Sequence, residues 1–285
     1  MLALVLVVGS TLSVLAGQLL RETEQLRSRE LRTAATQTVL SAVDLEMSRT
    51  IEAVRGAGLM VETQQNLSRD AFNRYAQHML VNVNSINFLE WQPVVQASEL
   101  RRFEAQARAA GQPQYRVLQP NAQRTGWEPV HDRNEYLPVL YGWPEHYATA
   151  GYDMSFSPER MASKHSAAMT GLPAASGVLN IMKNGKVASG DMGIAISTPV
   201  YRVDRSVNGY MTAVIDLPTL FQQATQRADG AKLDMLVYDL HSADSKPIYT
   251  WLGDATDLTA AMAASRSLGP LDQATTVDFA RQAWE

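Results

Sequence analysis

The stretch "ATAGYDMSFSPERMASKHSAAMTGLP", residues 148–173, predicts the end of a strand, a turn and a complete helix. Ser157 is a residue type that caps helices, and Pro158 fits the first helical position that follows it. Gly171 accepts the left-handed conformation in which many helices end. This segment therefore predicts a helix packed beside a strand, the basic unit of a mixed α/β fold.

The strand in this segment ends in an acid, Asp153, which lies between Tyr152 and Met154. A carboxylate here has two interpretations. It caps the following turn or pairs with Arg160 on the helix, as polar residues at turns often do. Alternatively, it accepts hydrogen bonds from a small ligand, which would supply the partner that a half-buried charge requires.

Composition narrows the classes of function. The chain has 285 residues, of which 46% are hydrophobic and 19% charged, and its net charge is −4. This balance supports a sizeable core and argues against nucleic-acid binding, which requires a basic surface. The absence of cysteine excludes disulfides, thiol chemistry and thiolate metal sites.

The first 20 residues, "MLALVLVVGSTLSVLAGQLL", predict a transmembrane anchor because they carry no charge. Twenty helical residues span the roughly 30 Å hydrocarbon core of a bilayer. A cleaved signal peptide is the alternative, although the basic region that opens such peptides is missing. We also expect the sequence to begin partway through a longer chain.

Residues 21–65 predict a stalk helix that continues the anchor. An apolar stripe recurs at steps of three and four residues, formed by Leu40, Val43, Met47, Ile51 and Val54. The stripe packs against a partner helix in a homodimer or against the domain that the stalk carries. The alternative is that the segment is one long core helix, and the sequence leaves these possibilities open.

The predicted fold class is α+β: a transmembrane helix, the stalk, and two PAS-like antiparallel-sheet domains in tandem. "INFLEWQPVV" (86–95) and "GIAISTPVY" (193–201) are strand-like, and Asn184-Gly185 predicts a hairpin before the latter. We assign residues 66–204 to a membrane-distal domain. Residues 205–285 form a membrane-proximal domain that is cut by the end of the sequence, with the boundary in the polar stretch "RVDRSVNG" (202–209).

Catalytic motifs are not found. The five histidines lie far apart without metal-ligand spacing, and no nucleophile elbow or phosphate-binding glycine loop is present. Asp216 in "VIDLP" is interpreted as a helix cap. Aromatic residues such as Tyr141 either line a pocket or belong to the core. The sequence thus predicts a chain that is not an enzyme and that needs no metal or cofactor.

Several segments, in this order, resemble the CHASE domain, the extracytoplasmic sensor module of cytokinin receptors and many bacterial receptors. They are "FLEWQPVV" (88–95), "FEAQARAAG" (103–111), "YLPVLY" (136–141), "GYDMSFSPERMASKHSAAMTGLP" (151–173) and "GIAISTPVY" (193–201). The resemblance implies a long helix carrying two PAS-like domains, with the ligand in the distal one. It also implies a second transmembrane helix after residue 285 and a cytoplasmic histidine kinase or cyclic-dinucleotide enzyme as output.

The resemblance also implies a ligand site. In plant members of the family, an aspartate that matches Asp153 hydrogen-bonds an adenine-type ligand, and the segment after the helix, here Ala175 and Ser176, lends main-chain contacts. Ser197 stands where a threonine is expected and keeps its hydroxyl. Ala175 is smaller than the leucine expected there, which argues against cytokinin itself as the ligand. We add Tyr141, Tyr152 and Met154 as neighbours to complete the expected ligand-binding set.

The expected partners are therefore a small ligand, adenine-type or another small organic molecule, a second copy through the stalk, and the membrane. The sensor would lie in the periplasm or outside the cell. Two rival functions remain: a periplasmic protein-interaction module, and an amino-acid or carboxylate sensor of related double-PAS type. The latter would require paired aspartates or an arginine clamp, for which the sequence shows no recognisable spacing.

Overall fold

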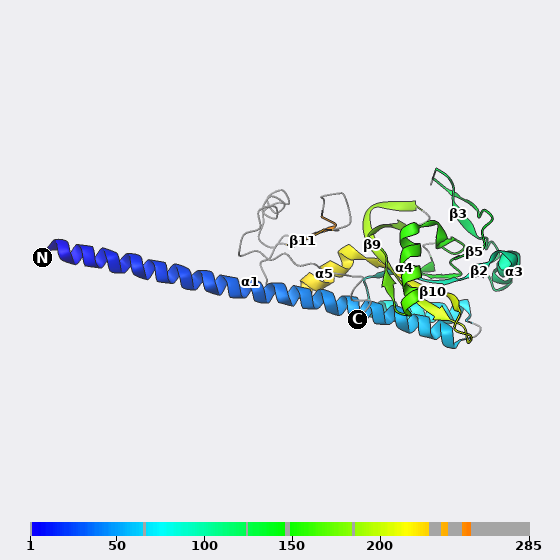
Figure 1. The fold of residues 1–285 in the computed structure, drawn as a ribbon, viewed down its shortest axis with the longest axis horizontal. Helices are drawn as coiled ribbons and strands as arrows, with labels where there is room; N and C mark the ends of the chain where they lie inside the picture. Colours follow the sequence, from blue (N-terminus) through cyan, green and yellow to red (C-terminus); the bar gives the residue numbers. More distant parts are fainter. Residues whose placement is uncertain are drawn as a thin grey trace.

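A helix of 62 residues, α1 (Leu2–Thr63), runs the length of the molecule and carries an α/β domain at its far end (Figure 1). The computed structural model describes residues 2–64, 67–123, 125–145, 149–183, 186–227, 235–238 and 247–251. The side chains of residues 2–17, 19, 22, 25, 28, 29, 32 and 182–191 lie outside this description. Helix α1 is about 90 Å long at 1.5 Å per residue. The predicted uninterrupted helix from Leu2 past Thr50 is confirmed.

The remaining helices and strands are short. The helices are α2 (Arg69–Asn82), α3 (Leu100–Ala109), α4 (Pro158–Thr170) and α5 (Leu217–Arg227), with 3-10 turns at Ala97–Glu99 and Met154–Phe156. The strands are β1 (Ile86–Pro93), β2 (Val95–Gln96), β3 (Leu118–Pro120), β4 (Trp127–Pro129), β5 (Glu135–Tyr136), β6 (Tyr141–Trp143), β7 (Ala174–Ala175), β8 (Leu179–Lys183), β9 (Lys186–Tyr201), β10 (Val207–Asp216), β11 (Met235–Val237) and β12 (Tyr249–Trp251). The predicted α+β class, with a long N-terminal helix and antiparallel sheets, is confirmed.

The main sheet has six antiparallel strands in the order β6-β1-β10-β9-β7, and β8 also pairs with β9. Lys183 of β8 lies opposite Lys186 of β9, as expected for the predicted hairpin. The two turn residues, 184 and 185, lie outside the described residues. Strands β1, β10 and β9 are the centre of the sheet, and most of the described side chains on β1, on β10 and on residues 193–200 of β9 are buried.

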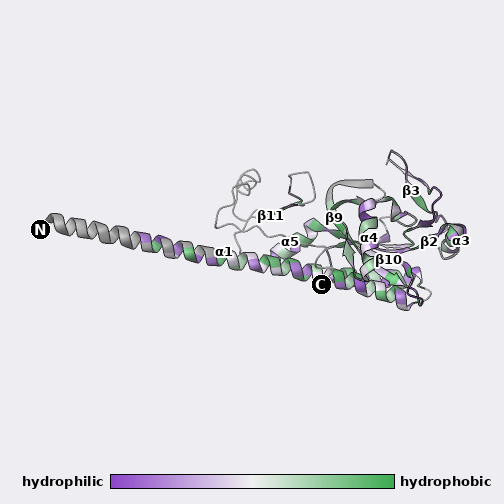
Figure 2. Ribbon diagram, in the orientation of Figure 1, coloured by the Kyte–Doolittle hydropathy of each residue, from purple (hydrophilic) through white to green (hydrophobic). Residues whose placement is uncertain are grey.

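Helix α1 covers one face of this sheet. Leu89, Ile196 and Met211 are buried on that face, in one cluster with Val43 and Val54 of α1. Figure 2 shows β9 and β10 coloured largely hydrophobic beside α1. Because side chains alternate along a strand, the neighbouring residues on β1, β9 and β10 point to the opposite face, where α4 lies.

The apolar stripe of α1 packs onto its own domain. Val43, Met47, Ile51 and Val54 are all buried, and buried residues on α1 extend from Val39 to Val61. The open alternative of a core helix therefore holds for this part of α1. The expectation that the stripe is the seam of a homodimer is wrong, because the hydrophobic side chains are already covered by the sheet and by α5.

The expected domain boundary between 204 and 205 is also corrected. Residues 202–206 form the turn of a hairpin in which β9 and β10 pair from Tyr201–Val207 to Gly193–Asp216. Ser206 closes this turn by donating from its backbone N–H and its hydroxyl to Asp204. Strand β10 thus belongs to the same sheet as β1 and β9, because both of its hydrogen-bonding edges are satisfied by these two strands.

A second PAS-like domain stays a prediction for the residues that follow α5. In this part the structure describes β11 and β12, which pair with each other, and the remainder lies outside the described residues. Asp216 accepts a hydrogen bond from the backbone N–H of Thr219 at 2.8 Å, which confirms the predicted cap of α5.

Across the part of the chain that the structure describes, no helix combines the length and the apolar character needed to span a membrane. Most side chains of the predicted anchor, residues 1–20, lie outside that part. The anchor stays a prediction.

Candidate functional site

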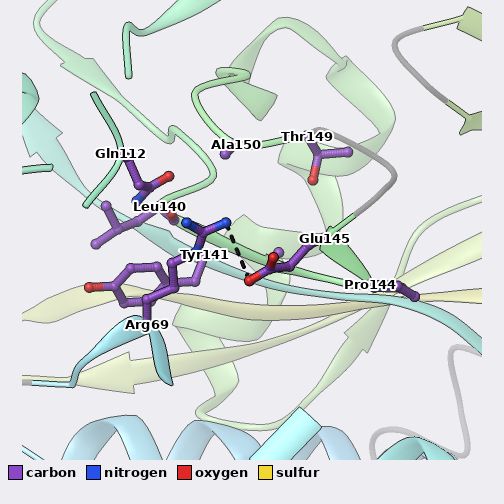
Figure 3. A pocket seen from close by; sticks show the side chains of 9 residues that line it. Arg69, Gln112, Leu140, Tyr141, Pro144, Glu145, Thr149 and Ala150 are labelled. Carbon is purple, nitrogen blue, oxygen red and sulfur yellow. Dashed lines mark hydrogen bonds and ion pairs between the residues drawn. The ribbon is translucent and has the colours of Figure 1, made fainter. Parts of the chain in front are cut away.

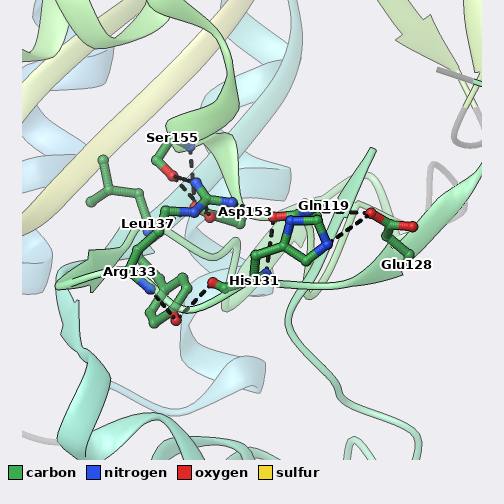
Figure 4. Close-up of polar contacts among 8 residues, drawn as sticks. Gln119, Glu128, His131, Arg133, Leu137, Asp153 and Ser155 are labelled. Carbon is green, nitrogen blue, oxygen red and sulfur yellow. Dashed lines mark hydrogen bonds and ion pairs between the residues drawn. The ribbon is translucent and has the colours of Figure 1, made fainter. Parts of the chain in front are cut away.

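Asp153 lies in a closed internal network (Figure 4). Its Oδ1 accepts hydrogen bonds from the backbone N–H groups of Leu137 at 2.9 Å and Ser155 at 3.1 Å. Its Oδ2 accepts from the Ser155 hydroxyl at 2.8 Å and lies 3.2 Å from Nη1 of Arg133. These contacts match the interpretation of Asp153 as a turn cap, with Arg133 rather than Arg160 as its ionic partner. A ligand contact at Asp153 would have to break one of them.

Tyr152 and Met154 belong to the same region of the fold. The ring of Tyr152 stacks on Trp127, with centroids 3.6 Å apart and 3° between the planes. Met154 is buried, and its backbone N–H donates to the carbonyl of Leu137. Both residues therefore make the packing contacts that hold the Asp153 turn in place.

Tyr141 borders a small polar cavity (Figure 3). Its hydroxyl donates to the carbonyl of Leu67 at 3.1 Å. The cavity, of about 30 Å³, is lined among others by Arg69 and Glu145, which form an ion pair at 3.3 Å. A space of this size holds about two water molecules and is too small for an adenine-type ligand.

Ala175, Ser176 and Ser197 lie on another side of the domain, where β7 pairs with β9. Ala175 is half-buried opposite Ile196. The hydroxyl of Ser176 accepts from the backbone N–H of Ala195 and donates to the carbonyl of Gly177. The expected ligand-binding residues are thus divided among three sets of contacts. Ser197, in the third set, also belongs to a row of buried polar side chains on the main sheet.

A row of polar side chains crosses the centre of the sheet on the face away from α1. Glu90 of β1 is the register partner of Thr212 on β10, which in turn is the partner of Ser197 on β9. The hydroxyls of Thr212 and Ser197 are 2.9 Å apart, and Gln92 donates to Glu90 at 2.7 Å. None of these four side chains is more than 2% exposed. Buried polar groups in the middle of a sheet are costly unless a partner compensates them.

Helix α4 faces this row with two basic side chains. Arg160 and Lys164 are four residues apart, so they lie on one side of the helix, and they are 7% and 0% exposed. The Lys164 Nζ donates to Ser197 Oγ over 3.4 Å and lies 5.9 Å from the ring centroid of Tyr210. The Arg160 Nη1 atom is buried and has no hydrogen-bond partner among the described residues.

The positive and negative charges between α4 and the row of polar side chains on the sheet do not balance. Burial and, to a smaller extent, the nearby Arg160 lower the pKa of Lys164 to about 7, against the opposing effect of Glu90. Burial also lowers the pKa of Arg160, against the effects of Glu90 and of Glu159 at the surface. Two cations therefore share one buried carboxylate, Glu90. We call Glu90, Arg160, Lys164, Ser197 and Thr212 the polar layer.

Apart from Ser197, sequence analysis missed the polar layer because it interpreted α4 by its capping signals alone. The buried face of α4 is Arg160, Ser163, Lys164 and Ala167, whereas Met169 is 75% exposed. A helix that turns its charged residues inward departs from the usual amphipathic pattern. The available signal was the arginine–lysine pair at a spacing of four, next to small residues. Such local departures are expected at functional sites.

The CHASE domain family model matches residues 65–249 of the chain. The comparison of this chain with curated proteins found no match. Among solved structures, an extracellular ligand-binding receptor from Desulfohalobium retbaense is 15% identical, with a TM-score of 0.43 over 82% of this chain and 33% of that one. This chain therefore spans about a third of the length of that protein.

Two further solved structures are similar. The ligand-binding domain of the Pseudomonas aeruginosa amino acid chemoreceptor PctC, in complex with GABA, is 11% identical, with a TM-score of 0.40 over 73% of this chain and 69% of that one. A methyl-accepting chemotaxis protein X is 12% identical, with a TM-score of 0.42 over 83% and 81% of the two chains. Likeness at this distance does not transfer a ligand or a site to this chain.

Proposed function

Because this chain belongs to the CHASE domain family, we propose that it is the extracytoplasmic sensor region of a transmembrane signalling receptor. CHASE is an extracytoplasmic sensor domain of membrane receptors. In this proposal, the distal α/β domain binds a small organic ligand. The signal passes to a cytoplasmic histidine kinase or cyclic-dinucleotide enzyme that would follow this sequence.

The observation that carries the ligand proposal is the polar layer between α4 and the sheet. Its residues come from α4, β1, β9 and β10, so a molecule bound there would touch both layers of the domain. A change in the distance between α4 and the sheet is a means of coupling occupancy to conformation. A ligand shifts such an equilibrium only by its difference in affinity for the two arrangements.

Membrane attachment and self-association complete the proposal. Residues 1–20 would anchor the chain, and the sensor domain would lie on the periplasmic or extracellular side. Two copies would associate along α1, on the face opposite the buried stripe. That face carries Leu20, Leu31 and Leu45, each at least 46% exposed.

Thermal unfolding of the full chain in detergent micelles tests ligand binding. The compounds come from three classes: purines, amino acids, and small carboxylates with their neutral amides. A compound that binds the native state alone raises the melting temperature by an amount that grows with its concentration. No shift with any class would contradict a small-ligand sensor and favour the rival function, a protein-interaction module.

A matched pair of variants locates the binding site. Ser197→Ala removes a hydroxyl from the polar layer, whereas Thr198→Val removes one from the next residue, on the face toward α1. We expect Ser197→Ala to weaken the ligand-induced shift and Thr198→Val to retain it. Equal shifts in the two variants would place the ligand elsewhere.

A further inference from the structure

The side chains that α4 directs toward the sheet indicate which kind of ligand the polar layer would bind. The helix has methionines and alanines that could have faced the sheet, yet it buries Arg160 and Lys164 and leaves Met169 in solvent. Desolvating two cations next to each other opposes folding, because each raises the cost of charging the other. An arrangement that is unfavourable in the empty protein is expected where a ligand supplies the missing charge.

The charges of the polar layer indicate which charge a ligand would have to supply. Arg160 and Lys164 contribute two positive charges, and the one acid that acts on both is Glu90. Glu90 also accepts a hydrogen bond from Gln92 at 2.7 Å, so part of its acceptor capacity is already used. The other buried acids among the described residues are Asp153, paired with Arg133, and Glu46 of α1, paired with Arg49. One negative charge would balance the layer.

The hydrogen-bond donors of Arg160 and Lys164 indicate which chemical group would carry that negative charge. The buried Nη1 of Arg160 lacks a partner, and the 3.4 Å contact between Lys164 and Ser197 is long for a hydrogen bond to an ammonium group. A carboxylate has two oxygens that can accept from a guanidinium and an ammonium group at once. Phosphate has more oxygens and more charge than the layer can match. A neutral purine would leave the positive charge uncompensated.

This inference rests on the proposed sensor function and specifies its ligand. We propose that the polar layer is a binding site for a small organic carboxylate, whose carboxylate group contacts Arg160 and Lys164 between α4 and the sheet. Ser197 and Thr212 complete the site as hydroxyl groups below the ligand. Lys164 and Ser197 are 0% exposed, so binding requires α4 to move away from β9 to admit the ligand.

The test compares acids with their uncharged amides on the full chain in detergent micelles. The probes are acetate, succinate and benzoate, each paired with acetamide, succinamide or benzamide, at pH 6.5 and constant ionic strength. We expect at least one acid to raise the melting temperature with saturation, and its amide to have no effect. Equal effects of acid and amide would overturn the carboxylate assignment, and so would an equal effect of inorganic phosphate.

Three variants assign the effect to residues. Arg160→Gln is expected to weaken the apparent Kd for the active carboxylate at least tenfold. Lys164→Met is expected to do the same while raising the melting temperature of the ligand-free protein, because a buried charge is removed. Arg101→Gln, at an exposed position of α3, keeps wild-type binding and controls for net charge. Unchanged binding in both α4 variants would refute the site.

The same measurements separate this inference from the sensor function. If a purine or one of the neutral amides raises the melting temperature while no acid does, the sensor function stands and the carboxylate proposal fails. If no compound of any class has an effect, the sensor function itself fails. The gain in ligand-free stability of Lys164→Met distinguishes an intact variant from a misfolded one.

Discussion

The ammonium group of Lys164 on α4 lies 3.4 Å from the hydroxyl of Ser197 on β9, and both side chains are wholly buried. Burial removes the water that would stabilise the charged form of this lysine, and it is the main reason that the pKa is lowered to about 7. The contact joins the two layers of the domain through a group that changes charge near neutral pH. It makes the stability of the protein depend on pH in a defined direction.

We predict that the ligand-free protein becomes more stable as pH rises from about 7 toward 10.5. The pKa of Lys164 is about 7 in the folded protein, against the ordinary value of 10.5 for a lysine. Between these values the unfolded chain binds more protons, so the free energy of unfolding increases with pH, by at most about 1.4 kcal/mol per pH unit for one proton. Below pH 7 both states are protonated and this contribution no longer varies.

Urea unfolding at pH 7, 8 and 9 measures this slope. The titratable groups around the ammonium are Arg160, Glu90 and Tyr210. The pKa of Tyr210 is raised to about 12 by burial, so this residue does not titrate in the window. Lys164→Met is expected to flatten the slope, whereas Arg101→Gln keeps it. A wild type and a Lys164→Met variant with the same slope would contradict the prediction.

Asp153→Ala is predicted to lower the free energy of unfolding by about 2 to 4 kcal/mol, because two backbone N–H groups lose their acceptor and Arg133 loses its carboxylate partner, although Arg133 still donates to Gln119 and Ser155. Chemical denaturation at pH 7 measures the loss. Arg133 is 31% exposed, which places the expected value below that of a fully buried pair. Any carboxylate-induced thermal shift should persist in this variant. Loss of the shift in a variant that still folds would restore Asp153 to the ligand site.

Met47→Ala is predicted to cost about 2 to 4 kcal/mol of stability, because Met47 is 2% exposed in the core between α1 and the sheet. Leu59→Ala, on the same helix, removes a side chain that is 56% exposed and should cost less than about 0.5 kcal/mol. Urea unfolding of the two variants compares them directly. Similar losses would mean that the buried stripe does not support the domain as described.

The homodimer is predicted to use the leucines on the exposed face of α1. Replacing both Leu31 and Leu45 by glutamate places like charges along that face and should weaken association at least tenfold. Sedimentation equilibrium of the full chain in density-matched detergent measures it, with circular dichroism to confirm that α1 remains helical. A monomeric wild type, or a variant that dimerises as well as the parent, would exclude this face as the contact.

Local sequence was sufficient for the features that depend on neighbours in the chain. Ser157 accepts a hydrogen bond from the backbone N–H of Arg160, and Gly171 ends α4 at a φ of 74°. Ser68 caps α2, and Asp216 caps α5. Each cap follows from the unpaired N–H and C=O groups at a helix end, which are satisfied within a few residues of sequence. The continuous α1 likewise follows from a long run without proline.

The partners of buried charges depended on tertiary structure. Asp153 pairs with Arg133, across 20 residues, and not with Arg160 seven residues away. Strand β10 joins the centre of the main sheet because it pairs with β1 on one edge and β9 on the other, although the turn before it resembled a linker. Hydrophobic periodicity could not predict that α4 turns Arg160 and Lys164 toward Ser197 and Glu90. That orientation is set by residues distant along the chain, because Glu90 lies 70 and 74 residues before the two basic side chains and Ser197 lies 33 residues after Lys164.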